Sequence, residues 1–300
     1  MTEGQIVKAL AGFYYVDTGN GVYMCRARGI FKKDNITPLV GDMVNITIQD
    51  EEEGVIEEIF PRKNAFIRPP VANIDLFIVT VSVISPELNT EIIDKFLVSA
   101  EAANAEVLIC INKLDLSVSE ARKIKRIYDN IYKVVLVSAT TGEGVDELIG
   151  ACAGKNVAFA GASGVGKTSL LGRITSIDNL ETGELSRKTG RGKHTTRCVE
   201  IFKTEENTKI YDTPGFTSFD VIDIGDERLD RFFPEFKEYL GKCRFDNCMH
   251  EVEPECAIIE ALNDGKIGKT RYRSYLTLLE IIRTGVKKKR PEFVKGRKNG

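Results

Sequence analysis

The chain has 300 residues, 42% of them hydrophobic, and its 42 basic residues are balanced by 44 acidic ones. This length excludes a single small domain and suits two or three, and the composition is that of a globular chain with a substantial core. The net charge by itself does not indicate a nucleic-acid partner. No run of about 18 apolar residues is present, and the amino terminus has no charged start followed by an apolar stretch, so we expect neither a membrane span nor a secretion signal.

Residues 1–67 are predicted to form an all-β domain. A Gly19-Asn20-Gly21 turn precedes an apolar segment at 22–25, and apolar and polar side chains alternate along 43–48. Several short strands in so few residues favour a small closed barrel, because closure removes exposed strand edges. We expect an OB-fold, which often binds oligonucleotides, although the composition does not separate it from an SH3-like barrel.

Residues 68–220 are predicted to form an α/β domain. Continuous apolar runs at 74–83, 107–111, 134–137 and 157–160 are typical of strands buried on both faces of a parallel sheet. Apolar residues recur at helical spacing between 92 and 100, so strands alternate with helices.

Residues 221–300 are predicted to form a small helical domain, with a helix at 272–282, that cannot hold a core without metal. Basic residues dominate its end, 283–300. This tail is either solvated or binds phosphate backbones.

A phosphate loop lies between a predicted strand and a predicted helix. It consists of Gly161, Ala162, Ser163, Gly164, Val165, Gly166, Lys167 and Thr168. Its glycines let backbone N–H groups approach phosphates, Lys167 supplies a positive charge to the β- and γ-phosphates, and Thr168 offers a hydroxyl to Mg²⁺. Lys167 is therefore a candidate catalytic residue. The loop alone would also suit a metabolic kinase or an ATPase.

A second motif indicates guanine. The candidate base-binding residues are Asn112, Lys113, Leu114 and Asp115, which follow one predicted strand, and Ser138 and Ala139, which follow another. The Asp115 carboxylate can accept hydrogen bonds from N1–H and the amino group of guanine, and adenine cannot offer that pair. Such a site can discriminate by about 10⁴-fold. Lys113 is expected to lie along the base and steady the phosphate loop, and residues 138–139 suit guanine O6.

A switch motif, Asp212-Thr213-Pro214-Gly215, comes last along the chain. Asp212 is expected to hold Mg²⁺ through water, and the Gly215 amide to sense the γ-phosphate. In an ordinary GTPase the phosphate loop comes first and the Asn-Lys-x-Asp motif near the end. Here the Asn-Lys-x-Asp motif precedes the phosphate loop, and this order predicts a circularly permuted GTPase domain.

The basic loop at 186–199 precedes this switch and carries further candidates. Thr195 or Thr196 is expected to coordinate Mg²⁺. Phe216 stands where many GTPases have a water-orienting glutamine, so unassisted turnover should be slow, on the order of 10⁻³ s⁻¹ or below. A partner or His194 must then assist hydrolysis.

A metal site is predicted near the carboxyl terminus, where three cysteines and a histidine cluster. The candidate ligands are Cys243, Cys248, His250 and Cys256. Three thiolates and one imidazole make a closed tetrahedral set for one structural Zn²⁺. The remaining cysteines, which are scattered, are expected to be buried thiols in a reducing cytoplasm.

Taken together, these motifs resemble the ribosome small-subunit-dependent GTPase family (RsgA, also called YjeQ). The resemblance covers nearly the whole chain and includes Gly192-Lys193-His194-Thr195-Thr196. Thr168 departs from a frequent serine, but both carry the needed hydroxyl. The family has an OB-fold, a permuted GTPase domain and a zinc domain, which match the fold expected here.

The resemblance implies that GTP is hydrolysed to GDP with Mg²⁺, in late maturation of the small ribosomal subunit, and that this subunit and its rRNA stimulate hydrolysis. We expect a cytoplasmic monomer that contacts neither DNA nor membrane. The alternative is an RNA-binding assembly factor whose nucleotide site is largely regulatory.

Overall fold

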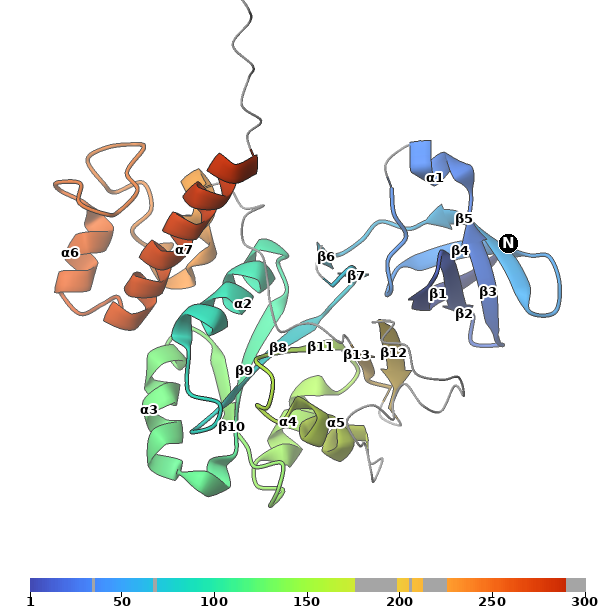
Figure 1. Ribbon diagram of the computed structural model, residues 1–300, viewed down its shortest axis with the longest axis horizontal. Coiled ribbons are helices and arrows are strands. Elements are labelled where there is room, and N and C mark those ends of the chain that lie inside the picture. Colours follow the sequence, from blue (N-terminus) through green and yellow to red (C-terminus); the bar gives the residue numbers. More distant parts are fainter. Residues whose placement is uncertain (34–35, 67–68, 176–198, 205–206, 213–225, 290–300) are drawn as a thin grey trace, which may run out of the picture. The chain divides into compact units, whose positions relative to one another are not determined.

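The computed structural model describes residues 1–33, 36–66, 69–175, 199–204, 207–212 and 226–289 (Figure 1). The chain divides into two compact units, Met1–Phe219 and Asp220–Gly300. Within the described ranges, no helix is both long enough and apolar enough to cross a membrane.

The amino-terminal strands form a closed barrel, drawn in blue in Figure 1. They are β1 (Thr2–Leu10), β2 (Phe13–Asp17), β3 (Val22–Ala27), β4 (Met43–Ile48) and β5 (Glu53–Ile59), with helix α1 (Gly29–Lys33) between β3 and β4. The strands run in the order β1-β2-β3-β5-β4, and pairing of β1 with β4 closes the ring. The predicted OB-like barrel is confirmed. Val44 and Ile46 lie in its core, whereas Ile48, at the end of β4, is 41% exposed.

The second half of the first unit is a sheet covered on both faces. Its strands are β8 (Leu76–Ser82), β9 (Glu106–Asn112), β10 (Lys133–Leu136), β11 (Asn156–Ala160), β12 (Glu200–Lys203) and β13 (Lys209–Asp212). Their order is β10-β9-β8-β11-β13-β12. The predicted parallel strands are confirmed, and β12, which was not predicted, runs antiparallel to β13.

Successive strand residues point to opposite faces of the sheet, so both faces are apolar and helices cover each of them. The helices are α2 (Thr90–Ala102), α3 (Val118–Tyr128), α4 (Val145–Cys152) and α5 (Lys167–Thr175). Along β8, Phe77 and Val79 pack in the core that holds α2 and α3, while Leu76 and Ile78 pack in the core that holds α4 and α5. This burial on both faces explains the continuous apolar run.

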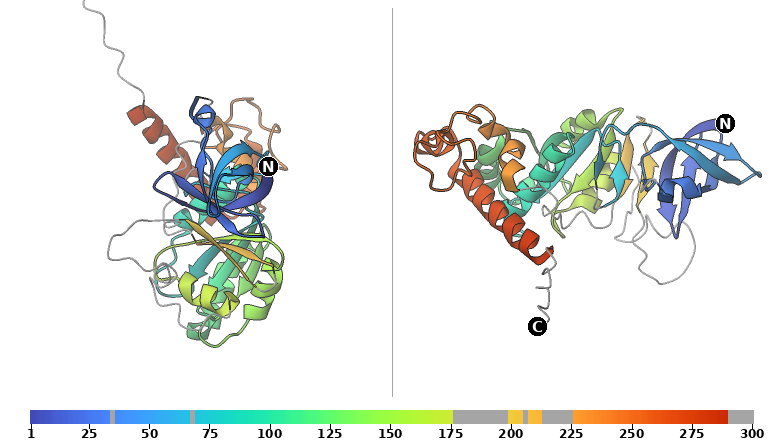
Figure 2. Two further views of the ribbon diagram at one scale, coloured as in Figure 1. Left: turned by 90° about the vertical axis from the view of Figure 1, so that its right-hand side faces the viewer. Right: turned by 90° about the horizontal axis from the view of Figure 1, so that it is seen from above.

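The barrel and the α/β sheet are joined edge to edge. Strand β1 pairs antiparallel with β12, with Lys8 opposite Glu200, so that both halves belong to one eleven-stranded sheet. In Figure 2 the gold strands β12 and β13 lie next to the blue barrel. A short hairpin, β6 (Ala65–Phe66) and β7 (Val71–Ala72), links the barrel to β8.

Over its described residues, 226–289, the second unit has three short helical segments and one long helix around an aromatic core. They are η3 (Asp226–Phe232), η4 (Pro234–Phe236), α6 (Ala257–Asn263) and α7 (Lys269–Lys289). Phe233 stacks on Phe236 at 5.2 Å and meets Tyr275 edge-on at 5.4 Å. The predicted helix at 272–282 is the middle of α7, which extends beyond it at both ends. In its first turn, fully buried Arg271 pairs with Glu235 at 2.7 Å and so belongs to the core.

Candidate functional site

The phosphate loop connects β11 to α5, and two of its glycines lie very close to atoms of β8 and β9. Gly161 has φ +145°, and a Cβ there would lie 2.2 Å from the Thr80 carbonyl oxygen. Gly166 has φ +95°, and a Cβ there would lie 2.3 Å from Nδ2 of Asn112. Only glycine fits these two positions, so they fix how the loop sits against β8 and β9.

The side-chain amide of Asn112, at the end of β9, joins three segments of the site. Its Nδ2 donates to the Val165 carbonyl at 2.9 Å, and its Oδ1 accepts from the Ala139 amide at 3.0 Å. The residue is 2% exposed. The amide therefore holds the predicted base motif, the phosphate loop and the loop after β10 in one arrangement.

Lys113 adds a second tie between the base motif and the phosphate loop. The residue has φ +66°, and its Nζ donates to the carbonyls of Gly164 at 2.8 Å and Ser85 at 2.5 Å. Its extended side chain thus spans from β9 to the phosphate loop, where it can lie along a bound base.

Asp115 and Ser138 meet at the ends of neighbouring strands. Ser138 Oγ donates to Asp115 Oδ1 at 2.5 Å and accepts from the Thr141 amide at 3.1 Å. The Leu114 amide donates to the Val137 carbonyl at 3.0 Å, and its side chain is buried. The Asp115 carboxylate is thereby oriented while it remains exposed, so a base can reach it.

Lys167 begins α5 with its ammonium over the loop. Its Nζ donates to the carbonyls of Gly161 at 2.7 Å and Ala162 at 3.0 Å. Burial lowers the pKa of Lys167. An anionic phosphate in the loop would favour the charged form and offset that cost. Thr168, in the first turn of α5, is half-buried beside it.

Arg173 is a residue of the site that sequence reasoning missed. It lies on α5, and its Nε donates to the Ala139 carbonyl at 2.9 Å while Nη2 donates to the Thr140 carbonyl at 2.8 Å. The helix that follows the phosphate loop therefore also holds the loop expected to contact guanine O6. No local pattern marks this arginine, because its partners are far away in sequence.

The switch candidates are described only in part. The backbone of Asp212 ends β13, which pairs with β11 through Ala158 and Tyr211. His194, Thr195, Thr196 and Gly215 lie outside the described residues.

In the second unit, the structure brings the predicted metal ligands together. The ligand atoms of Cys243, Cys248, His250 and Cys256 all lie within 4.8 Å of one another. His250 Nδ1 is 3.6 Å from Cys243 Sγ and 3.3 Å from Cys256 Sγ, and these two sulfurs are 3.8 Å apart. Bonds of about 2.3 Å to sulfur and 2.1 Å to nitrogen put tetrahedral ligands roughly 3.5–3.8 Å apart. The donor set could therefore hold a tetrahedral metal ion.

Neighbouring side chains orient the histidine of this cluster, and sequence reasoning missed them. Asp230 Oδ2 lies 3.4 Å from His250 Nε2, and the Tyr272 hydroxyl donates to the His250 carbonyl at 2.6 Å. A carboxylate on the second ring nitrogen leaves Nδ1 facing the sulfurs, as metal-binding histidines require. Burial, with the adjacent cysteines, raises the pKa of Cys248 to about 12, and a divalent cation would reverse that balance.

Replacing Arg173 with methionine should lower the selectivity for guanine over adenine nucleotides by about tenfold. The reason is that the loop at 138–142 loses two charged hydrogen bonds, each of which typically contributes about 1.5–3 kcal/mol. The measurement is a competition titration of GDP against ADP. Arg122→Met, on the exposed surface of α3, is the control. Unchanged selectivity in Arg173→Met would limit Arg173 to a packing role.

Comparison with known proteins assigns the family. Residues 59–222 match the RsgA GTPase family model, and residues 3–56 match that of the RsgA N-terminal domain. The small ribosomal subunit biogenesis GTPase RsgA of Caldanaerobacter subterraneus subsp. tengcongensis is 48% identical, over 96% of this chain and 98% of that protein.

Two solved structures share the fold. The crystal structure of YjeQ from Thermotoga maritima is 35% identical with a TM-score of 0.80, covering 94% of this chain and 98% of that one. That of YloQ, described as a circularly permuted GTPase, is 35% identical with a TM-score of 0.76, covering 98% of this chain and 97% of that one. This chain therefore belongs to the RsgA GTPase family and is a circularly permuted GTPase.

Proposed function

We propose that this chain hydrolyses GTP to GDP and phosphate during late maturation of the small ribosomal subunit, and that the subunit stimulates hydrolysis. The observation that carries the nucleotide assignment is the Asn112 amide, which joins the guanine motif to the phosphate loop. The relatives named as small ribosomal subunit biogenesis GTPases support the partner, because they match along almost their whole length.

Each nucleotide residue has a proposed role. Asp115 accepts from guanine N1–H and the amino group, and the loop at 138–139 faces O6. The phosphate loop and Lys167 bind the β- and γ-phosphates. Mg²⁺ would be held by Thr168, by Asp212 through water, and by Thr195 or Thr196, while the Gly215 amide reads the γ-phosphate.

The barrel is the proposed contact with rRNA. The Arg26 guanidinium lies 4.8 Å from the centre of the Phe13 ring, beside a hollow of about 220 Å³ that both residues line. A cation over a half-buried aromatic ring at the barrel surface suits contacts with bases and phosphates. The basic residues of 283–300, which begin in the last turns of α7, would add phosphate contacts that weaken with salt.

We further propose domain boundaries that follow these roles. The barrel comprises residues 1–67, the permuted GTPase domain 68–220, and the helical domain 221–300, which carries one structural Zn²⁺. The protein would act as a cytoplasmic monomer.

Stimulated hydrolysis is tested by single-turnover phosphate release with and without purified small subunits. We expect the small subunit to raise the rate at least about tenfold, with GTP as substrate and ATP inert. Lys167→Ala should abolish turnover, and large subunits serve as the control. GTP binding without turnover in either condition would favour the alternative of a regulatory nucleotide site on an RNA-binding factor.

His194 is proposed to assist hydrolysis, because Phe216 cannot orient water. His194→Ala should lower kcat of the stimulated reaction by about 10²-fold, the lower end of general acid–base contributions, and leave GTP affinity unchanged. Lys193→Ala, a charge removed from the same loop, is the control. A stimulated kcat equal to that of the unmodified protein would refute the role.

Zinc removal should unfold the second unit and leave the first folded. Structural zinc typically contributes about 10–16 kcal/mol of apparent binding free energy to small domains. Limited proteolysis with and without a chelator measures this. The cleavage sites that appear only with the chelator should all lie after residue 220. Cys248→Ser should reproduce the chelator pattern and Cys25→Ser, a buried barrel thiol, should not. A digestion pattern indifferent to chelator would count against a structural ion.

A further inference from the structure

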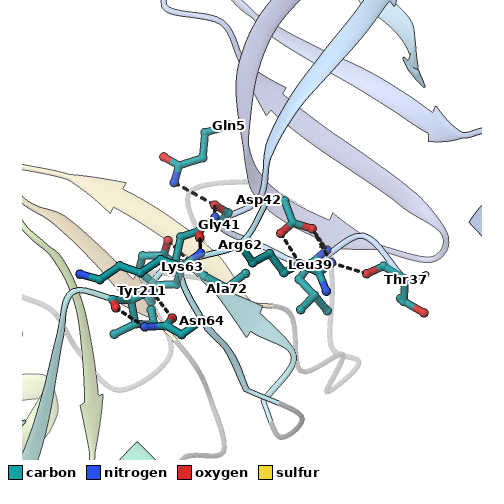
Figure 3. Close-up of polar contacts among 12 residues, drawn as sticks. Gln5, Thr37, Leu39, Gly41, Asp42, Arg62, Lys63, Asn64, Ala72 and Tyr211 are labelled. Carbon is teal, nitrogen blue, oxygen red and sulfur yellow. Dashed lines mark hydrogen bonds and ion pairs between the residues drawn. The ribbon is translucent and has the colours of Figure 1, made fainter. Parts of the chain in front are cut away.

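Tyr211 stands directly before Asp212 in β13, and its side chain is built into the junction with the barrel (Figure 3). The residue is 1% exposed, and its hydroxyl donates to the Ala72 carbonyl at 3.1 Å. On the barrel side, Gly41 has φ +98°, and a Cβ there would lie 2.5 Å from the Tyr211 hydroxyl oxygen. The barrel backbone and the tyrosine therefore approach as closely as glycine allows.

The hairpin that accepts this hydrogen bond is itself fastened to the barrel. The Ala72 amide donates to the Val40 carbonyl at 2.9 Å, and Asn73 Nδ2 donates to the Gly41 carbonyl at 2.9 Å. Arg62, which precedes the hairpin, binds the fully buried Asp42 carboxylate through Nε and Nη2, both at 2.7 Å. Such a two-pronged charged contact is geometrically restrictive, so the segment that leads into the hairpin is held against the barrel.

A second set of contacts reaches the barrel from strands β13 and β12. Lys209 Nζ, on β13, donates to Gln5 Oε1 at 2.6 Å, and Gln5 Nε2 donates to the Gly41 carbonyl at 3.2 Å. On β12, Glu200 pairs with Lys8 at 3.0 Å. The basic loop at 186–199 runs into β12, and Asp212 ends β13. Both strands next to the proposed switch segments are thus attached to the barrel.

Not all of this junction is tightly packed. A cavity of about 260 Å³ lies beside the Gln5–Lys209 contact, lined by barrel residues together with Ile201 and Lys203. Polar contacts next to such a space can exchange partners without disturbing the apolar cores on either side. The Gln5–Lys209 contact thus borders open space, whereas the Tyr211 side chain is closely packed.

We propose that Tyr211 is a positioning residue through which the barrel and the nucleotide site act on each other. A nucleotide that favours one position of the Asp212 backbone also favours one arrangement of the contacts that β13 makes through Tyr211 and Lys209. By linkage, RNA bound to the barrel biases Asp212 by the same free energy. This proposal rests on the proposed GTPase function and adds the route by which RNA reaches the site.

Hydrogen exchange on the full chain tests the route without ribosomes, in Mg²⁺ with GDP or a non-hydrolysable GTP analogue. In the unmodified protein, exchange at residues 2–10, 39–44 and 62–74 should differ about fivefold or more between the two nucleotides. Tyr211→Phe, from the strand side, and Gln5→Met, from the barrel side, should each abolish that difference. Tyr23→Phe, a half-buried tyrosine elsewhere in the barrel, should keep it.

Protection of residues 161–168 by GDP is the internal reference. Its retention in the variants shows that they fold and bind nucleotide, so a lost difference in the barrel reports coupling and not collapse. If one variant does not fold, the other decides. A barrel indifferent to nucleotide in the unmodified protein, or a difference that survives in the folded variants, would overturn the proposal. Absence of ribosomal stimulation would be a separate failure, of the proposed function.

Discussion

The buried amide of Asn112 fixes the geometry on which the nucleotide site depends. Its donor and acceptor lie in one plane and are used by different loops, and an unpaired buried amide would cost about 1–3 kcal/mol. The phosphate loop, the base motif and the loop after β10 therefore assemble together. None of these contacts depends on the order in which the chain visits the strands, because a parallel sheet gathers its loops at one edge. Permutation leaves the pocket intact for this reason.

What permutation changes is the surroundings of the switch strands. Strand β12 would be an exposed sheet edge, with unpaired backbone groups that invite association. Here β1 of the barrel pairs with it and continues the sheet. The same arrangement places Gly41 and Ala72 against Tyr211. The docked barrel thus covers the edge of β12 and also contacts β13, the strand that ends at Asp212. A barrel tethered only through a flexible linker would do neither.

The sequence predicts the features that local patterns encode. Apolar runs mark β8 to β11, glycine spacing marks the phosphate loop, and Cys/His spacing marks a cluster that the fold assembles. Arg173, Asp230 and Tyr211 were not predicted, because each acts through partners distant in sequence and an arginine, an aspartate or a tyrosine has no distinctive local signal. The antiparallel strand β12 was missed for a related reason: four residues beside a basic loop become a strand only through pairing with β13 and β1.

Charge links the phosphate loop to the stability of the first unit. The Lys167 pKa is lowered by burial, so at neutral pH its ammonium is held at a cost that a phosphate group would remove. Relief of this cost is part of the free energy of nucleotide binding, and bound nucleotide stabilises the folded state by mass action. Because β11 lies next to β13, and β13 next to β12 and the barrel, that stabilisation is applied to the sheet to which the barrel is attached. A response of the barrel to nucleotide state thus requires that β13 respond, and β13 contacts the linking hairpin through Tyr211 and the barrel through Lys209.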